Sequence, residues 1–167
     1  DLMQGANPTA ATYAKENEMF VRVTARAASE EEAHKMMEPL SSAIQKRIGS
    51  YVYAVDCETL EEVAVQELLK AGKTLATAES CTGGLLSKRI TDVSGASQVF
   101  EMGAVTYANR IKEQVLGVSP QTLAEHGAVS EETAREMAQG IRKAAGSDLG
   151  VGITGIAGPG GGTKEKP

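Results

Sequence analysis

The sequence predicts an α/β protein: a three-layer α/β/α sandwich with a mainly parallel sheet, preceded by a small α/β segment. In residues 56–167, short apolar runs alternate with amphipathic helical patterns. Strands that alternate with helices form parallel sheets whose two faces are covered by the helices. A separate strand and helix pattern occupies residues 1–55. We therefore expect two domains, residues 1–55 and 56–167, that meet near Asp56.

The first domain is expected to fold in the order β-α-β. Apolar and polar side chains alternate over residues 18–25, which is typical of a strand. Ser29 is expected to cap a helix, because three glutamates follow it where the positive end of the helix dipole favours them. Pro39 is expected to kink or split that helix. Residues 51–55 are expected to form the second strand.

The second domain is expected to begin with a helix over residues 59–71, which ends at Gly72, a common residue after a helix. A strand over residues 74–78 then leads into a turn that contains Ser80, and a helix follows to about residue 92. Residues 99–106 read as the next strand, although a glycine interrupts it.

Three helices and one strand are expected in the rest of the chain. A helix over residues 109–116 ends at Gly117, and Ser119 with Pro120 begins the next, because serine caps helices and proline suits their first position. Ser130 begins a longer helix that ends near residue 146. The last strand, residues 148–154, runs into a glycine-rich loop. Ligands bind beyond the carboxyl ends of parallel strands, so we expect this loop and the Ser80 turn to share a site.

Composition excludes several classes of function. A formal charge of −5 argues against generic binding to nucleic-acid phosphates, and no apolar run approaches the roughly 20 residues that span a bilayer. Cys57 and Cys81 have no CxxC partner or histidine cluster nearby, so we expect no metal and no cofactor. Reduced thiols predict a cytoplasmic location. The chain starts without methionine and stops on a glycine loop, so we expect both ends to be cut.

The turn around Ser80 has two interpretations. Ser80 or Thr82 is either the cap of the next helix or, for Ser80, a nucleophile on an exposed turn. His34 and His126 are poorly placed as bases, which leaves a Ser-Lys arrangement with Lys112. The start of a helix disfavours a cation and would lower the pKa of Lys112, whereas the alternative is a solvated lysine.

Two neighbours of these residues and one loop complete the candidates. Tyr107 stands at the end of the strand that precedes Lys112. It either relays a proton, supports the Lys112 amine or is merely a half-buried aromatic. Cys81 is a rival nucleophile or a small buried thiol. The glycines of residues 154–163 allow a close approach of backbone N–H groups to an anion, and the alternative is a flexible surface loop.

Four blocks of sequence together resemble a known family. They are Ala78-Glu79-Ser80-Cys81-Thr82-Gly83-Gly84, Gly103-Ala104-Val105-Thr106-Tyr107-Ala108-Asn109, Glu125-His126-Gly127-Ala128-Val129-Ser130 and Thr154-Gly155-Ile156-Ala157-Gly158-Pro159-Gly160-Gly161-Gly162. In order and spacing they look like the C-terminal domain of the bacterial CinA family, the competence/damage-inducible proteins, which is known as a nicotinamide mononucleotide amidohydrolase. Residues 1–55 are similar to the KH-like linker domain of that family.

The resemblance implies a reaction and its residues. It implies deamidation of nicotinamide mononucleotide to nicotinate mononucleotide and ammonia, in pyridine nucleotide recycling, with Ser80 as nucleophile, Lys112 as base and Tyr107 as a third catalytic residue. The substrate would bind to eight residues: Cys81, Thr82, Gly83, Gly84, Thr154, Gly155, Gly158 and Gly160. A homo-oligomer, a dimer or higher, is expected. The longer parent would also carry an N-terminal domain associated with ADP-ribose pyrophosphatase activity.

Other functions stay open beside this one. The chain could be a non-catalytic nucleotide-binding or scaffold module linked to competence or DNA damage. The KH-like resemblance raises binding of nucleic acid, but residues 1–55 have six basic residues against seven acidic ones and no G-x-x-G loop. We therefore expect an interface or linker role for residues 1–55.

Overall fold

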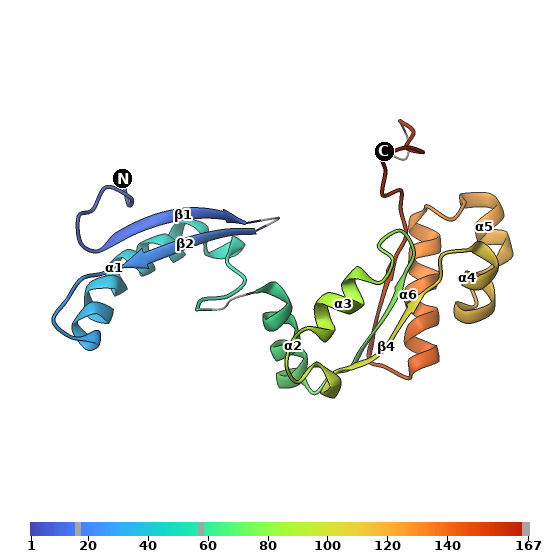
Figure 1. The fold of residues 1–167 in the computed structure, drawn as a ribbon, viewed down its shortest axis with the longest axis horizontal. Coiled ribbons are helices and arrows are strands. Elements are labelled where there is room, and N and C mark those ends of the chain that lie inside the picture. The colour runs from blue at the N-terminus through green and yellow to red at the C-terminus, as the bar shows by residue number, and fades with distance from the viewer. Residues whose placement is uncertain (16–17, 57–58, 165–167) are drawn as a thin grey trace. The chain divides into compact units, whose positions relative to one another are not determined.

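The computed structural model describes residues 1–15, 18–56 and 59–164 of the chain. The chain divides into two compact units, Asp1–Val55 and Asp56–Pro167 (Figure 1). Cys57, one of the two cysteines considered above as a metal ligand, lies outside the described residues. None of the helices in the described part of the chain combines the length and apolar character that crossing a membrane requires.

The first unit has the order β-β-α, so the expected β-α-β order is wrong. Strand β1 (Thr9–Lys15) pairs antiparallel with β2 (Glu18–Thr24), and helix α1 (Glu30–Ile48) follows. Residues 9–15 lack a clear alternation of polar and apolar side chains, which is why the sequence did not reveal β1. The strand expected at residues 51–55 does not form: a 3-10 turn, η1 (Gly49–Tyr51), ends there, and Tyr51 and Val55 are exposed.

Helix α1 is continuous through Pro39, so of the expected kink or split the split does not occur. Ser29 caps it as predicted, since its hydroxyl accepts a hydrogen bond of 3.2 Å from the Glu32 N–H. Pro39 removes one backbone hydrogen bond and lies on the exposed side of the helix, so its ring displaces nothing in the core.

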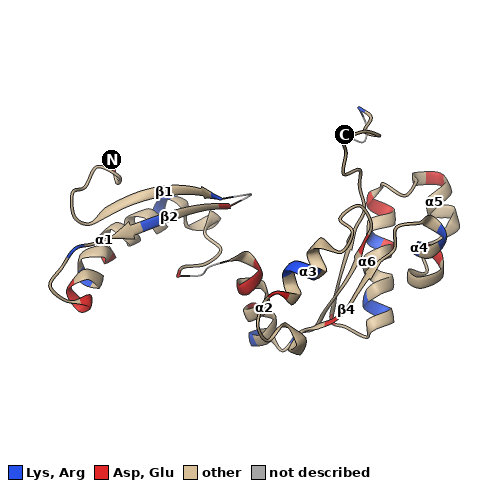
Figure 2. Ribbon diagram, in the orientation of Figure 1, with Lys and Arg blue, Asp and Glu red and all other residues tan. Residues whose placement is uncertain are grey.

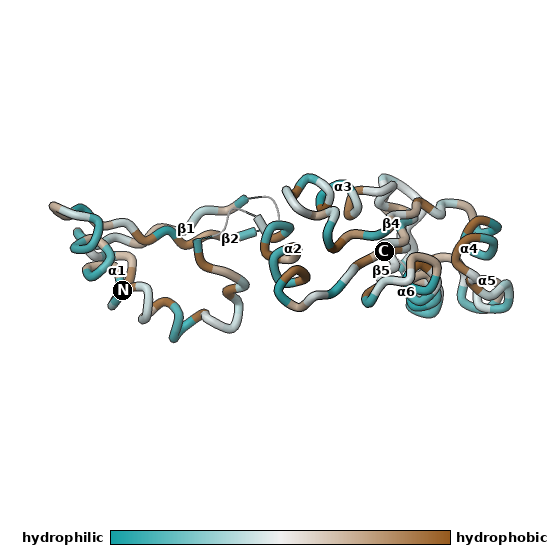
Figure 3. Tube along the Cα trace, turned by 90° about the horizontal axis from the view of Figure 1, so that it is seen from below, coloured by the Kyte–Doolittle hydropathy of each residue, from teal (hydrophilic) through white to brown (hydrophobic). Residues whose placement is uncertain are grey.

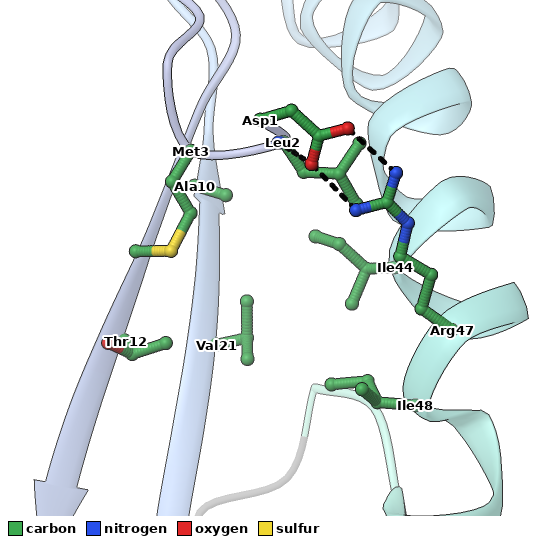
Figure 4. A pocket seen from close by; sticks show the side chains of 9 residues that line it. All are labelled: Asp1, Leu2, Met3, Ala10, Thr12, Val21, Ile44, Arg47 and Ile48. Carbon is green, nitrogen blue, oxygen red and sulfur yellow. Dashed lines mark hydrogen bonds and ion pairs between the residues drawn. The ribbon is translucent and has the colours of Figure 1, made fainter.

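A pocket of about 230 Å³ separates the two layers of the first unit (Figure 4). Apolar side chains from β1, β2 and α1 line it, including Ala10, Val21 and Ile44. At its rim, Arg47 donates two hydrogen bonds of 2.7 and 2.9 Å to the Asp1 carboxylate. The sheet and helix of this unit are therefore incompletely packed against each other.

The second unit is built on a parallel sheet of three strands in the order β4-β3-β5. These are β3 (Leu75–Glu79), β4 (Phe100–Val105) and β5 (Leu149–Ile153). Because β3 pairs in parallel with both neighbours, the carboxyl ends of all three strands lie at one edge. This agrees with the α/β class and the mainly parallel sheet predicted from the sequence.

Helices cover both faces of this sheet (Figure 1). On one face, Leu75 packs in a core with residues from α2 (Leu60–Ala71), α3 (Leu85–Thr91) and the short η2 (Ala96–Gln98). On the other face, Ala76 and Ala78 pack against α4 (Asn109–Leu116), α5 (Pro120–His126) and α6 (Glu131–Ala145). Figure 3 shows hydrophilic residues along the outer side of α6, and Figure 2 shows charges of both signs there. The three layers give a central strand, β3, that is buried along its whole length.

Candidate active site at the carboxyl ends of the strands

Ser80 lies directly beyond the end of the central strand β3. Its N–H donates a 3.0 Å hydrogen bond to the Ile153 carbonyl at the end of β5, and its carbonyl accepts one of 3.1 Å from the Gly83 N–H. Ser80 is buried, with 7% of its surface exposed. The neighbouring strand and the turn thus fix its backbone on both sides.

Lys112 brings its amine to this serine from helix α4. The Lys112 Nζ lies 3.1 Å from the Ser80 Oγ, 2.8 Å from the Thr106 carbonyl and 2.9 Å from the Tyr107 carbonyl. The residue is 1% exposed and has no carboxylate partner among the described residues, a combination that is rare for lysine. Strand β4 supplies both carbonyls through the two residues that follow it. The contact is therefore assembled from the ends of β3 and β4 and from α4.

Burial lowers the pKa of the Lys112 amine, and the electrostatic interaction with Cys81 acts in the opposite direction without reversing this. The lowered pKa was expected, but from a different cause. Lys112 is the fourth residue of α4, and its removal from water lowers its pKa.

The three contacts of the amine dictate its role when it is neutral. A carbonyl oxygen only accepts hydrogen bonds, so the two N–H bonds of a neutral amine that keeps these partners go to Thr106 and Tyr107. The remaining position on nitrogen, its lone pair, then faces the Ser80 hydroxyl. This is the geometry in which an amine takes a proton from a serine.

Tyr107 enters the site through its main chain. Its carbonyl supports the Lys112 amine, while the residue as a whole is 75% exposed. Thr106, which sequence analysis did not single out, supplies the other carbonyl and is almost fully buried. A main-chain contribution leaves no signature in residue type, so the sequence could not have revealed it.

The turn after Ser80 presents backbone N–H groups. Gly83 and Gly84 have φ angles of 62° and 101°, a conformation that favours glycine. Within the described residues, the N–H groups of Cys81, Thr82 and Gly84 donate to no protein acceptor, whereas that of Gly83 is used inside the turn. These three donors can serve an anionic or carbonyl oxygen of a ligand.

Neither Ser80 nor Thr82 caps helix α3, so that expectation is wrong. Gly84 stands at the cap position, and the Glu79 carboxylate accepts hydrogen bonds from the Leu86 and Ser87 N–H groups at 3.0 and 2.8 Å. Thr82 instead donates its hydroxyl to Glu79. The sequence offers one weak signal for this cap, an acidic residue at the end of a mostly apolar strand and a few residues before the helix.

Only the beginning of the predicted glycine loop lies against the turn. A Cβ added to Gly155 would lie 3.3 Å from the Cys81 Sγ, which places these two residues side by side. Thr154 donates its hydroxyl to the Ala128 carbonyl at 2.7 Å. Gly158 and Gly160 are exposed, and no contact joins them to the Ser80 turn in the part of the chain that the structure describes.

The histidines lie outside this arrangement. His34 is 3.7 Å from Glu30 on α1, and His126 is 3.8 Å from Glu132 near the start of α6. Among residues 1–15, 18–56 and 59–164, no group of three or more His, Cys, Asp or Glu side chains could hold a metal ion.

Comparison with known families assigns the chain that carries this site to a protein family. Residues 57–167 match the family model of the CinA C-terminal domain. The chain belongs to the CinA family. The first unit fits the same family, because residues 1–54 match the model of the damage-inducible protein CinA KH domain.

Curated CinA relatives are similar over nearly the whole chain. A CinA-like protein of Desulfovibrio desulfuricans is 55% identical over 167 residues, which are 100% of this chain and 39% of the relative. A CinA-like protein of Kosmotoga olearia is 54% identical over 161 residues, 96% of this chain and 39% of that protein. The chain thus spans about two fifths of the length of these relatives.

Solved CinA structures share the fold. The competence/damage inducible protein CihA from Agrobacterium tumefaciens is 43% identical, with a TM-score of 0.60 over 68% of this chain and 71% of that one. A competence-damaged protein (CinA) superfamily protein from Escherichia coli is 34% identical, with a TM-score of 0.62 over 72% and 73% of the two chains.

Proposed function

We propose that the second unit hydrolyses the amide of nicotinamide mononucleotide by a Ser-Lys mechanism. The observation that carries the proposal is the buried Lys112 amine, whose Nζ lies 3.1 Å from the Ser80 Oγ and whose other contacts are two carbonyls. Membership of the CinA family and the motifs around Ser80 support nicotinamide mononucleotide as the substrate.

The first half of the reaction forms an acyl-enzyme. Neutral Lys112 takes the proton of the Ser80 hydroxyl while the Ser80 Oγ attacks the carboxamide carbon. The backbone N–H groups of Thr82 and Gly84 hold the oxygen that becomes negative, an effect worth about 3 kcal/mol for each well-placed donor. Protonated Lys112 then gives its proton to the amide nitrogen, and ammonia leaves as the C–N bond breaks.

The second half restores the serine. Lys112, again neutral, takes a proton from a water molecule whose oxygen attacks the nicotinoyl ester. The ester C–O bond breaks, the proton returns to the Ser80 Oγ, and nicotinate mononucleotide leaves. The turn and the Thr154–Gly155 segment, which lie side by side, are where we place the ribose and 5′-phosphate.

Ammonia release from nicotinamide mononucleotide tests the proposal. Ser80→Ala removes the nucleophile and should lower kcat by at least about 10³-fold. Ser94→Ala, which alters an exposed serine beyond α3, should retain the wild-type rate. Equal release by the wild type and Ser80→Ala would contradict the mechanism. Saturable binding of the nucleotide by a wild type that releases no ammonia would indicate a non-catalytic nucleotide-binding module instead.

A further inference from the structure

Glu79, the residue before Ser80, carries a buried carboxylate with no cationic partner in the described residues. It is the last residue of β3 and is 0% exposed. Burial raises the pKa of the Glu79 carboxyl, but hydrogen bonds from Ser87, Thr82 and Leu86 outweigh burial and leave this pKa below its ordinary value. An ionised carboxylate is costly to bury, and four hydrogen bonds offset the cost here. The presence of a charge at this position therefore requires an explanation.

The four hydrogen bonds span the turn that contains Ser80. One carboxylate oxygen accepts from the Thr82 hydroxyl at 2.7 Å and from the Leu86 N–H at 3.0 Å. The other accepts from the Ser87 N–H at 2.8 Å and from the Ser87 hydroxyl at 2.6 Å. The side chain of Glu79 therefore closes a loop over residues 80–85 and joins its two ends.

A further hydroxyl gives this network a direction. The Thr77 and Ser87 hydroxyls are 2.7 Å apart. Because Ser87 donates its proton to Glu79, Thr77 is the donor in its contact with Ser87. The Thr82 and Ser87 hydroxyls thus donate to the carboxylate and Thr77 donates to Ser87, so the network leaves no acceptor for the proton of a neutral Glu79.

The main chain of Glu79 connects the turn to the acceptors of Lys112. The Glu79 carbonyl accepts a 2.8 Å hydrogen bond from the Thr106 N–H, and the Thr106 carbonyl in turn holds the Lys112 amine. One residue thus fixes the turn through its side chain and the end of β4 through its backbone.

We propose that Glu79 is a positioning residue: its ionised side chain holds the turn so that the Ser80 Oγ meets the Lys112 amine and the N–H groups of Cys81, Thr82 and Gly84 face the substrate. The proposal rests on the function proposed above. Four charge-assisted hydrogen bonds are directional, and a displacement of about 1 Å at a reacting atom can cost on the order of 10²-fold in rate.

Glu79→Gln is the test, because it keeps the shape of the side chain and replaces one oxygen by an N–H₂ group. Whichever way the amide turns, its N–H₂ group faces the N–H of Leu86 or of Ser87, and that hydrogen bond is lost. We expect at least tenfold faster amide exchange in peptides covering residues 80–88. We also expect at least tenfold slower labelling of Ser80 by a fluorophosphonate, and at least a tenfold lower kcat for nicotinamide mononucleotide with KM changed less than threefold.

Glu136→Gln is a matched control. The Glu136 carboxylate accepts hydrogen bonds from the Ser119 N–H at 2.7 Å and the Thr122 hydroxyl at 2.6 Å, so, like Glu79, it accepts a backbone N–H and a hydroxyl at the start of a helix. It makes no contact with the Ser80 turn among the described residues. Glu136→Gln should change the labelling of Ser80 and kcat less than twofold. This should hold even if Glu136→Gln and Glu79→Gln lower the melting temperature by the same amount.

The outcomes separate the two proposals. Unchanged exchange or unchanged labelling in Glu79→Gln would overturn the role of Glu79, as would an equal loss of labelling in Glu136→Gln. Normal labelling of wild-type Ser80 without ammonia release would contradict the substrate alone and leave the role of Glu79 supported by the other readouts. A wild-type Ser80 that the probe does not label would contradict the nucleophile and its positioning together.

Discussion

At the residue scale, Lys112 shows how a chemically ordinary side chain becomes a base. Lysine is a cation in water, and only a neutral amine can accept the proton of a serine. The interior around Lys112 offers two carbonyls and one hydroxyl and no carboxylate partner in the described residues, so the charged form loses more on burial than it regains. The two carbonyls fix the direction of the lone pair of the neutral amine, because they take both of its N–H groups.

The pH dependence of kcat should report this amine. Only neutral Lys112 is competent, so kcat should rise with pH and level off above the pKa of Lys112, at a pH below that of an ordinary lysine because burial lowers this pKa. Steady-state rates between pH 6 and 10.5 measure this rising limb of the plot of kcat against pH. Lys112→Arg stays charged and should be inactive throughout; a limb that persists in Lys112→Arg would exclude Lys112 as the base.

The residues of the site were predictable to different degrees. Ser80 and Lys112 could be named as candidates because each follows a strand, but the resemblance to the CinA family, rather than residue type, favoured them as nucleophile and base. Their contact depends on β4 and β3 being neighbours, which the sequence does not state. Glu79 was missed because a capping carboxylate that precedes its helix by several residues has no fixed spacing.

At the element scale, helix ends in the second unit were the most predictable feature. Thr59, Ser119 and Ser130 each accept a hydrogen bond from an N–H in the first turn of the helix that they precede. Gly72 and Gly117 end their helices with φ angles of 60° and 69°. Local chemistry decides such boundaries, whereas β1 in the first unit forms because of its pairing with β2, a non-local cause.

The packing of α6 on α4 depends on a single glycine. A Cβ at Gly140 would lie 2.0 Å from the carbonyl of Leu116, the last residue of α4. Gly140→Ala gains up to about 1 kcal/mol of helix propensity but should lose about 1–3 kcal/mol to overpacking, so we expect a net loss of stability. Urea unfolding followed by circular dichroism measures it.

Gln139→Ala, at an exposed position of the same helix, is the control for the glycine variant and should change stability by less than about 0.5 kcal/mol. Because α4 carries Lys112, Gly140→Ala should also lower kcat. A Gly140→Ala protein as stable as Gln139→Ala would show that the contact with Leu116 relaxes without cost.

At the scale of the whole molecule, the two units differ in how much core they contain. Ala10 is the only buried residue among those described in Asp1–Val55, and a pocket of about 230 Å³ separates its sheet from α1. The second unit has buried cores on both faces of its sheet. Stability follows buried apolar surface, so the units should differ in stability.

Hydrogen exchange in increasing urea should reveal this difference. Peptides from residues 1–55 should lose protection at a lower urea concentration than peptides from residues 74–79 and 131–145, because the first unit has less apolar surface to lose. Mass spectrometry of peptic fragments resolves the two groups. Loss of protection by both groups at one urea concentration would mean that the units unfold together.

The two carbonyls that hold Lys112 belong to the main chain, and this affects how a mutational scan of the site should be interpreted. Replacement of the side chain at Thr106 or Tyr107 leaves the acceptor atom in place, so tolerance to substitution there says nothing about whether the amine needs it. The scan would show intolerance at Ser80 and Lys112 and underestimate the other half of the site. Only a change of the backbone itself, such as an ester in place of a peptide bond, would reveal the contribution of these carbonyls.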